Sequence, residues 1–397
     1  MKRANPGRIA ALRSLIGVEE GGHAEELLAN LAPQGGPDRA LAWHLTLGTL
    51  RWQGSLDHSL NPHLRRGINQ LDPQVRNALR MGLFEALKSR TPARAAVHQA
   101  VECTKAVGMR RASGMVNAVL RKASQTPLSE DPAATLPPWL VERWARYEDW
   151  IRRIREPAII SVAGTPPRDL DVSSSYVGGQ AIDGLWTLPP SVGQVAHLSG
   201  YAEGAFWVMD PAAAAVADLV AEVTEGARTV LDACAAPGGK SFRMLAKGLS
   251  VTAVDGSVER LARMRENLDR LKLSLDLRQH DWLSGPLPET STYDAVLVDA
   301  PCSALGVVRR HPEILWRRQA GDPAAMSIGQ RIILKHASKH VKAGGALIYA
   351  VCSTEPEEGS AVVNSLDGWT VTKTWSSIPP EGDEDGFQAF VLRRDED

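Results

Sequence analysis

The stretch "LDACAAPGGKSFRML" (residues 231–245) indicates how the C-terminal half of the chain folds. Its apolar beginning is typical of a short buried strand and its end of the first turns of a helix, with a loop of small residues between them. The residues Gly239-Lys240-Ser241 match the end of a phosphate-binding P-loop, G-x-x-x-x-G-K-[ST]. That pattern needs a glycine where this chain has Cys234. The loop therefore differs from an ATP-binding loop at its first glycine.

From residue 209 onward, short apolar strands alternate with helical segments. The expected strands are 229–233, 251–255, 275–281, 294–301 and 345–353, and the expected helices are 240–247, 257–271 and 323–341. This alternation is typical of βαβ units, in which helices cover both faces of a parallel sheet. Residues 368–378 and 386–394 are expected to close the sheet as an antiparallel pair. The sequence therefore predicts an α/β fold for this part.

The loop after the first of these strands suits a nucleoside. Gly238 and Gly239 allow close approach of the backbone, and Pro237 with the small Ala235 and Ala236 keeps the space beside it open. An ATPase would need the missing glycine and also a partner for Mg²⁺. A nucleoside without a triphosphate needs neither. S-adenosylmethionine therefore fits the loop better than ATP.

Four aspartates end strands of the predicted sheet: Asp232, Asp255, Asp281 and Asp299. Ligands of open α/β sheets lie at the carboxyl ends of the strands. Asp255 follows Asp232 by 23 residues, where an acidic residue holds the ribose hydroxyls of a nucleoside. Each carboxylate taken alone fits a turn or a helix cap equally well. Together they predict a ribose ligand, an adenine ligand and, in Asp299, a group at the reacting end.

Two of the four cysteines follow predicted strands at this same edge. The cysteines are Cys103, Cys234, Cys302 and Cys352, and none forms a C-x-x-C pair. We therefore expect neither a disulfide framework nor a metal site. A lone cysteine is most often buried and inert, but Cys302 and Cys352 together predict nucleophilic chemistry. The nearby cations Arg309, Arg310 and His311 are candidates for lowering a thiol pKa.

A methyl donor beside a nucleophilic thiol indicates methylation at carbon 5 of a pyrimidine. That carbon is too weakly nucleophilic to take a methyl group directly. Addition of a thiol to carbon 6 makes carbon 5 enamine-like, and loss of the carbon-5 proton later expels the thiol. In this scheme Asp299 holds the N3 edge of a cytosine in its protonated, activated form.

Residues 1–123 are expected to be all-helical. In "LDPQVRNALRMGLFEAL" (residues 71–87), Asp72 suits the N-cap and Pro73 the first helical position. Apolar residues at helical spacing predict a single buried stripe on this helix. Residues 39–52 and 113–123 are expected to be further helices, 124–138 a linker, and 139–154 one amphipathic helix.

The charge of the chain is unevenly distributed. Residues 1–128 hold 18 Lys and Arg against 9 Asp and Glu, a net charge of +9, whereas the remainder holds 27 against 37, a net charge of −10. A basic front end predicts contact with a polyanion such as RNA, although a merely solvated basic face has the same composition. No apolar run reaches the roughly 18 residues of a membrane span and no leader is evident, so we expect no membrane contact and a cytoplasmic location.

Three stretches, "DACAAPGGK", "DAPCSALGVVRRHPEI" and "YAVCSTEPEE", closely resemble motifs of the NOL/NOP/Sun family of RNA 5-methylcytosine methyltransferases. "LGTLRWQGSLD" and "GMVNAVLRK" are similar to the NusB-like RNA-binding domain of its bacterial 16S ribosomal RNA members, and "EGDEDGF" to their closing segment. The resemblance implies a Rossmann-like class I methyltransferase domain with a mixed seven-stranded sheet, preceded by an all-α NusB-like domain. It also implies S-adenosylmethionine as cofactor, RNA (free 16S rRNA) as partner, and a monomer.

The resemblance also assigns roles to residues. The family's cofactor loop falls on Cys234, Ala235, Ala236, Pro237, Gly238, Gly239 and Lys240. Asp255 corresponds to the ribose carboxylate, Asp281 to the adenine-side carboxylate and Asp299 to the active-site aspartate. In this family the cysteine of the later "TC" motif attacks the base, which implies Cys352 as nucleophile and Cys302 as the residue that helps release product. Pyrimidine DNA methyltransferases use a "PC" cysteine instead, so spacing alone leaves both assignments open.

The predicted division of the chain is a NusB-like domain over 1–128, a linker over 129–140, a small RNA-contacting subdomain over 141–208 and the methyltransferase domain over 209–397.

The predicted function is RNA (cytosine-5-)-methyltransferase. The alternative is a non-enzymatic NusB-like RNA-binding protein with a degenerate methyltransferase body, which the intact cysteines and strand-end acids disfavour. Methylation of an exocyclic nitrogen would need an Asn/Asp-Pro-Pro-aromatic tetrad where this chain has Asp299-Ala300-Pro301-Cys302, so we discard it.

Overall fold

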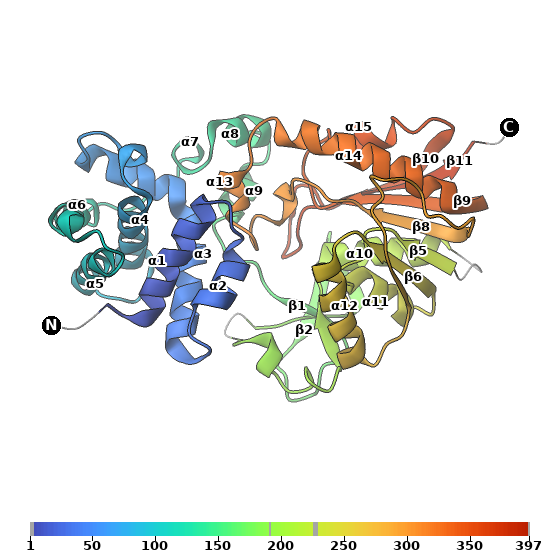
Figure 1. Cartoon of the computed structure of the whole chain (residues 1–397), viewed down its shortest axis with the longest axis horizontal. Coiled ribbons are helices and arrows are strands. Elements are labelled where there is room, and N and C mark those ends of the chain that lie inside the picture. Colours follow the sequence, from blue (N-terminus) through green and yellow to red (C-terminus); the bar gives the residue numbers. More distant parts are fainter. Residues whose placement is uncertain (1–3, 190–191, 225–228, 396–397) are drawn as a thin grey trace. The chain divides into compact units, whose positions relative to one another are not determined.

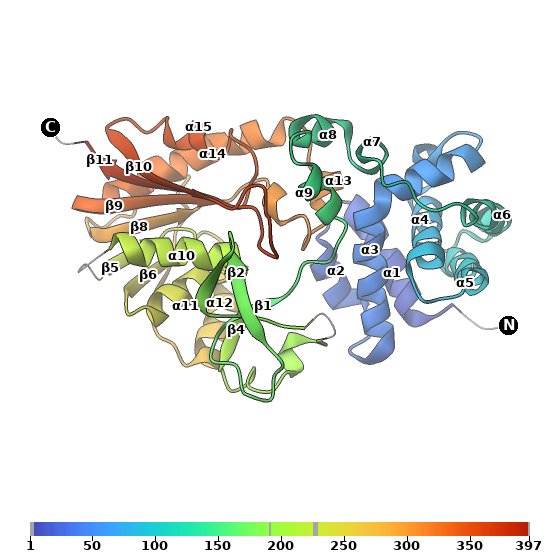
Figure 2. The same cartoon turned by 180° about the vertical axis from the view of Figure 1, so that it is seen from behind.

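The computed structural model describes residues 4–189, 192–224 and 229–395. Within these residues the chain forms two compact units (Figures 1 and 2). The helical unit contains the residues up to Pro157 together with Val308–Ala320, and the sheet unit contains Ala158–Val307 and the residues from Gly321 onward. The division of the chain into four functional parts (1–128, 129–140, 141–208 and 209–397) stays a prediction, because compactness alone does not test what each part does.

The helical unit is built around one central helix, α4. Its helices are α1 (Pro6–Glu19), α2 (Ala24–Leu31), α3 (Gly36–Leu60), α4 (Pro73–Lys88), α5 (Ala93–Ala106), α6 (Ser113–Ala123), α7 (Pro132–Thr135), α8 (Pro138–Trp144), α9 (Glu148–Arg153) and α13 (Ile314–Arg317). Helix α4 contacts α1, α3, α5 and α6, and Figure 1 shows these helices gathered around it. Pro73 begins α4 as expected, and Asp72 precedes it, although the Asp72 side chain makes no capping hydrogen bond.

The expectation of a single buried stripe on α4 was wrong. Arg80 and Glu85, which lie off that stripe, are also buried, at 3% and 1% exposure. They are tolerated because each is paired: Arg80 Nε lies 2.7 Å from Asp57 Oδ1, and Glu85 accepts hydrogen bonds from Arg8. A buried charge is costly unless an opposite charge and hydrogen bonds compensate for it. Part of the positive charge of this unit is therefore used inside its core.

Residues 139–154 form two short helices, α8 and α9, and not the single helix that we expected. The break lets Trp144 and Trp150 turn toward each other, edge to face, with ring centroids 6.2 Å apart. Both residues are 1% exposed, so these tryptophans are packing residues. A continuous helix would place side chains six positions apart on different faces, and one core would not bury both.

The segment Val308–Ala320 belongs to the helical unit although it lies within the C-terminal half of the sequence. The Trp316 indole nitrogen donates a hydrogen bond of 2.7 Å to the Leu50 carbonyl, and Trp316 packs on the core of this unit. Arg51 donates to the Arg309 carbonyl at 2.9 Å. Glu313, which is 1% exposed, accepts from the Ala24 amide at 3.3 Å. A long-range segment thus completes the helical core.

The sheet unit contains a seven-stranded mixed sheet. Its strands are β5 (Thr229–Asp232), β6 (Ser250–Asp255), β7 (Asp276–Gln279), β8 (Tyr293–Asp299), β9 (Val341–Val351), β10 (Trp369–Ser376) and β11 (Gln388–Arg394), in the spatial order β10-β11-β9-β8-β5-β6-β7. Strands β5 to β9 are parallel, and β10 and β11 form the antiparallel pair expected from the sequence. The Rossmann-like fold predicted for this half is confirmed.

Helices cover both faces of this sheet (Figures 1 and 2). One face packs against α10 (Pro211–Val223), α11 (Gly239–Ala246) and α12 (Val258–Leu271), and the other against α14 (Asp322–Ala337) and α15 (Ser360–Val363). The expected helix over 323–341 is shorter, because Val341 already begins β9. Both layers bury alternate side chains of the parallel strands, which is why these strands read as continuous apolar runs.

Four short strands that precede α10 form a second, antiparallel sheet in the sheet unit. Its strands are β1 (Ser161–Gly164), β2 (Ser173–Val177), β3 (Gln180–Thr187) and β4 (Phe206–Val208), in the order β2-β3-β1-β4. Across the described ranges of the chain, no helix is both long and apolar enough to span a membrane.

Candidate active site

The predicted site residues gather at the carboxyl ends of four parallel strands. Strand β5 pairs with β6 on one side and with β8 on the other, and β9 lies beyond β8. The connections that leave β5 and β8 therefore run to opposite sides, and a topological switch point lies between these two strands. Ligands of doubly wound folds bind at this kind of switch point.

The glycine loop, Cys234–Lys240, follows β5 directly and turns into α11. Gly238 has a φ of +113°, and a side chain there would also meet the Phe242 ring, 2.2 Å from its Cβ. A Cβ on Gly239 would meet no atom within 4 Å. The loop thus needs glycine at 238 for its own turn, whereas its backbone at 239 faces open space where a ligand can approach.

Asp255 connects the glycine loop to the end of β6. Its carboxylate accepts hydrogen bonds from the Ala236 amide at 3.2 Å and the Ser257 amide at 2.9 Å. It also lies 2.9 Å from Arg260. The Asp255 side chain is 1% exposed and that of Arg260 is 46% exposed, so Arg260 is the partner that a ligand can displace.

Asp232 is a member of this site that the sequence analysis placed at a strand end but gave no role. Its Oδ2 accepts a hydrogen bond of 2.6 Å from the Ser241 hydroxyl. Its Oδ1 is buried and has no hydrogen-bond partner among the described residues. Burial, reinforced by the charges of Asp299 and Asp255, raises the pKa of Asp232 to about 7. A buried carboxylate oxygen without a donor suits a ligand that brings a positive charge or an N–H group.

Asp299 ends β8 and is paired with Lys240 from the glycine loop. The distance between Lys240 Nζ and Asp299 Oδ2 is 2.6 Å. Burial opposes the charge of Lys240, but the attraction of Asp299 outweighs it and the Lys240 pKa is raised. The ammonium also lies 4.9 Å from the centre of the Phe387 ring. Phe387 belongs to the "EGDEDGF" segment, which thereby reaches the site.

The two candidate thiols are in contact. The sulfur atoms of Cys302 and Cys352 lie 3.4 Å apart, each just beyond the end of its strand. The hydrogen bond to Cys302, burial and the charge of Asp299 raise the pKa of Cys352 well above its ordinary value, while Lys240 opposes this shift. The cation that acts on this thiol is therefore Lys240.

The cations that we expected beside Cys302 belong to the helical unit, whereas Cys302 belongs to the sheet unit. Arg309, Arg310 and His311 belong to the segment of the helical unit described above, and Arg309 is 2% exposed. The chain leaves the sheet unit at Val307, so a role for these three residues in lowering a thiol pKa stays a prediction.

The remaining predicted residues differ in their surroundings. Asp281 is exposed two residues beyond β7, and its Oδ1 accepts from the Leu283 amide at 3.0 Å. Its Cα lies 3.9 Å from the position of a Cβ on Gly256, so it borders the loop that follows Asp255. Burial and the nearby aspartates raise the pKa of Cys234 well above its ordinary value, which argues against a nucleophilic role for that thiol.

Known proteins similar to this chain identify its family. The pattern of the family described as 16S rRNA methyltransferase RsmB/F matches residues 220–379, and that of the NusB family matches residues 5–125. Ribosomal RNA small subunit methyltransferase B of Pseudomonas putida is 34% identical over 401 residues, which cover 91% of this chain and 88% of that protein. The chain belongs to the RsmB/F family. The protein of the same name from Xanthomonas campestris is 34% identical over 90% of this chain and 87% of its own length.

Solved structures agree with this RsmB/F fold. The crystal structure of PH0851 has a TM-score of 0.78 and covers 97% of this chain and 99% of its own, at 20% identity. A methyltransferase homolog protein from Pyrococcus horikoshii has a TM-score of 0.50 and covers 65% of this chain and all of its own, at 19% identity. At these identities the likeness concerns the fold alone.

Two positions beside the second cysteine depart from the motif of the NOL/NOP/Sun family that this chain resembles: Val351 replaces a threonine and Gly359 an asparagine. The structure accommodates both. Val351, where threonine is usual, is fully buried in the core of the sheet unit. Gly359, where asparagine is usual, leaves room for Gln388, whose Oε1 would lie 2.3 Å from a Cβ at that position. Gln388 uses this space to donate a 2.8 Å hydrogen bond to the Ser353 carbonyl. The glycine thus permits a different support for the loop after Cys352.

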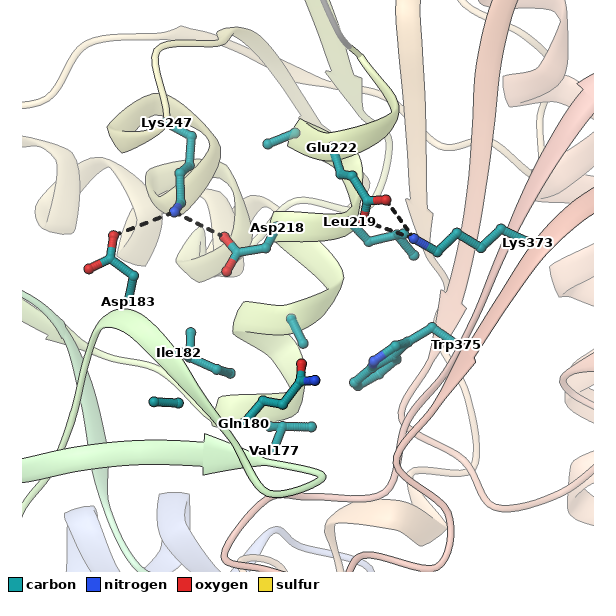
Figure 3. Close-up of a pocket in the computed structure, with 13 residues that line it drawn as sticks. Val177, Gln180, Ile182, Asp183, Asp218, Leu219, Glu222, Lys247, Lys373 and Trp375 are labelled. Atoms are coloured by element: carbon teal, nitrogen blue, oxygen red, sulfur yellow. Dashed lines mark hydrogen bonds and ion pairs between the residues drawn. The ribbon is translucent and has the colours of Figure 1, made fainter.

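A separate pocket lies on the α10 side of the sheet unit (Figure 3). It has a volume of about 520 Å³ and includes none of the predicted site residues. Lys247 lies 3.9 Å from both Asp183 and Asp218, and Lys373 lies 2.7 Å from Glu222. Because its cations are paired with its own carboxylates, this pocket does not suit an anionic ligand.

The raised pKa of Cys352 predicts a steep pH dependence of its reactivity. Only the thiolate is alkylated, so below the pKa its rate should rise about tenfold per pH unit between pH 7 and 9. Iodoacetamide labelling of the folded protein, quantified for the Cys352 peptide by mass spectrometry, measures this rate. Lys240→Met should slow labelling at each pH, because the cation that favours the thiolate is lost. A wild-type rate that levels off below pH 8 would contradict the raised pKa.

Proposed function

We propose that this chain transfers a methyl group from S-adenosylmethionine to carbon 5 of a cytosine in 16S rRNA. The observation that carries the proposal is the 3.4 Å contact between the sulfur atoms of Cys302 and Cys352 at the ends of two neighbouring parallel strands. Two thiols in contact beside a strand-end aspartate suit a reaction that forms and later breaks a carbon–sulfur bond. Membership of the RsmB/F family supports the same substrate class.

The residues around the glycine loop fit S-adenosylmethionine. Asp255 would hold the ribose hydroxyls in place of Arg260, and Asp281 would border the adenine. Asp232, whose buried Oδ1 has no donor among the described residues, would accept from the positively charged methionine part. The cofactor supplies an electrophilic methyl group on a sulfonium. Gly239 leaves the backbone open to close approach, as a bound nucleoside requires.

The residues of this chain then divide the work on the base. The Cys352 thiolate forms a bond to carbon 6, and the thiol proton ends on N3 of the cytosine, whose edge Asp299 holds. The electron pair of the former double bond makes carbon 5 nucleophilic, so that it takes the methyl group. Cys302, 3.4 Å from Cys352, acts in the second half: its sulfur takes the carbon-5 proton, the double bond re-forms as the Cys352 thiolate leaves, and that thiolate takes back the proton from N3.

In the alternative, a non-enzymatic RNA-binding protein, only the helical unit would have a function and the sheet unit would be an inactive scaffold. Against it stand the Lys240–Asp299 ion pair, whose burial costs desolvation energy, and the contact between two thiols at the ends of neighbouring strands, neither of which RNA binding by the helical unit requires. We further propose that the enzyme acts in the cytoplasm on free 16S rRNA as a monomer, that the residues before 129 contact the RNA, and that residues 141–208 assist them.

Cofactor binding should not depend on Mg²⁺. Calorimetry should show S-adenosylhomocysteine binding without the metal, and Asp232→Asn should weaken it by about tenfold or more, since a charge-assisted hydrogen bond of about 1.5–3 kcal/mol is lost. Asp218→Asn, which alters a carboxylate of the separate pocket, is the matched control and should leave this affinity unchanged. Tight binding of ATP that requires Mg²⁺ would overturn the cofactor assignment.

The same Asp232→Asn variant should be more stable than the wild type at pH 8 and not at pH 4. The Asp232 carboxyl has an ordinary pKa of 3.8 and a pKa of about 7 in the folded protein. The folded state therefore binds the proton more tightly, and the wild type loses stability as the pH rises from about 4 to 7. Asparagine does not titrate, so thermal unfolding at the two pH values measures the difference. An equal effect at both values would contradict the raised pKa.

Replacing each of the two cysteines by serine should stop turnover at a different step of the reaction. Cys352→Ser should abolish turnover and leave no covalent complex, because a serine hydroxyl is far less ionised near neutral pH. Cys302→Ser should also lose turnover but accumulate a protein–RNA adduct, linked through Cys352, that survives denaturing electrophoresis. An adduct that forms in Cys352→Ser and maps to Cys302 would reverse the two roles.

A further inference from the structure

A basic groove lies between α5 and α6 of the helical unit, two helices that pack side by side. It has a volume of about 780 Å³ and is lined by Ala93, Arg94, Val97, His98, Val101, Asn117, Arg121, Lys122, Ser124 and Gln125. None of these ten residues is acidic, and the four basic or histidine side chains are exposed. Val97 and Val101 supply an apolar floor, and the amide and hydroxyl groups are able to donate hydrogen bonds.

Elsewhere in the helical unit, several cations are occupied by carboxylates. Arg8 pairs with Glu85, and Arg76 and Arg80 both pair with Glu19. By contrast, in the described part of the chain, Arg94, Arg121 and Lys122 make no ion pair. Part of the net charge of +9 carried by residues 1–128 is therefore exposed at this groove without a carboxylate partner among the described residues, whereas the cations around α4 are neutralised.

We infer that this groove, which we call the α5–α6 groove, binds the phosphate backbone of the RNA substrate. The inference deepens the proposed function and rests on it for the identity of the RNA. Phosphates need cations and hydrogen-bond donors without competing carboxylates, and the groove provides both. An acidic protein segment would meet the same charges, and the experiment below separates it from RNA.

The test compares two triple variants of the full-length protein. Arg94→Ala, Arg121→Ala and Lys122→Ala remove three charges from the α5–α6 groove, whereas Arg13→Ala, Arg65→Ala and Arg66→Ala remove three exposed charges elsewhere on the same unit. Binding of a labelled 16S rRNA fragment is measured over a series of salt concentrations. The groove variant should bind more weakly and lose roughly 2–3 from the slope of log affinity against log salt. The control variant should keep the wild-type slope.

Two outcomes would overturn the proposal that the groove binds RNA. The first is an equal loss of RNA affinity in both triple variants, which indicates diffuse electrostatic attraction. The second is that the groove variant binds RNA as the wild type does but no longer binds a poly-glutamate peptide that the wild type binds. An unchanged helical circular-dichroism signal and melting temperature show that both variants are folded. If the wild type binds RNA through the groove but forms no 5-methylcytosine, the proposed activity fails and the groove stands.

A second inference concerns Glu358, which is fully buried beside the two thiols. Its Oε1 accepts hydrogen bonds from the Ser303 amide at 2.7 Å and from Gln330 Nε2 at 3.0 Å. Its Oε2 accepts from the hydroxyls of Ser303 and Ser353. These two serines directly follow Cys302 and Cys352. One carboxylate therefore joins the two backbone segments that carry the thiols.

Other contacts make this connection rigid. The same Gln330 nitrogen donates to the Pro301 carbonyl at 2.9 Å, so Cys302 is held on both sides. The two serine hydroxyls lie 3.1 Å apart. The Tyr349 hydroxyl donates to the Glu358 carbonyl at 2.7 Å and fixes the backbone that presents the carboxylate.

The structure assigns to Glu358 the role of a positioning residue that sets the distance between the Cys302 and Cys352 sulfur atoms. It has no place in contact with the base, because it is 0% exposed. A simple structural role would affect folding stability alone. A positioning role also affects the rate of the folded enzyme, since a misplacement of about 1 Å costs roughly a hundredfold.

Glu358→Gln tests this role, because it keeps the shape but turns one acceptor into a donor. The expected result is a kcat lowered roughly ten- to a hundredfold, with KM for RNA unchanged. Glu85→Gln is the matched control: the same substitution at an equally buried carboxylate of the helical unit, which should lower the melting temperature and leave kcat as it is.

A probe of the sulfur–sulfur distance needs no substrate. Phenylarsine oxide condenses with two close thiols, forming two arsenic–sulfur bonds and releasing one water. The affinity of phenylarsine oxide should be equal for the wild type and Glu85→Gln and lower for Glu358→Gln. If Glu358→Gln lowers the melting temperature but leaves both kcat and the affinity for phenylarsine oxide unchanged, Glu358 is not a positioning residue. If Glu358→Gln does not fold, Ser353→Ala removes one of the four hydrogen bonds for the same measurements. A wild type that binds the arsenical but transfers no methyl group would refute the activity and still test Glu358.

Discussion

The hydrogen bonds that Glu358 accepts are the constraint on which the chemistry of this fold depends. Strands β8 and β9 pair in parallel, with Asp299 opposite Ala350. From these positions the chain takes three residues to reach Cys302 but only two to reach Cys352. The pairing of β8 and β9 alone therefore does not place the two thiols directly opposite each other along the strand direction. The carboxylate that joins Ser303 to Ser353 takes up this difference, and the sulfur atoms meet at 3.4 Å.

Electrostatics shape the rest of the site. Three carboxylates, Asp232, Asp255 and Asp299, end neighbouring strands, and Lys240 is the cation whose charge acts on Asp299 and Cys352. This excess of negative charge favours a positively charged ligand and disfavours a thiolate. The pKa of Cys352 is raised mainly by its hydrogen bond to Cys302 and by burial, and Asp299 adds to this shift. The approach of a cation to the site would therefore favour the thiolate.

Local patterns in the sequence predicted the parts of this site that are built locally. The strand–loop–helix around Cys234–Lys240, the carboxylates at strand ends and the closing β10–β11 pair follow from periodicity and small residues. The sequence did not indicate Glu358, because its partners are brought to it by tertiary structure from as far as 55 residues away. For the same reason the sequence did not indicate that the segment from Val308 to Ala320 packs with the helical unit: only the folded chain shows that Trp316 completes the helical core. Buried ion pairs such as Arg80–Asp57 likewise appear in the sequence as surface charge.

Bisulfite sequencing of 16S rRNA from cells with and without this gene tests the central claim most directly. The account predicts one 5-methylcytosine that disappears when the gene is deleted. The wild-type gene should restore it and a gene carrying Cys352→Ser should not. An identical pattern of 5-methylcytosine in 16S rRNA with and without the gene would contradict the account.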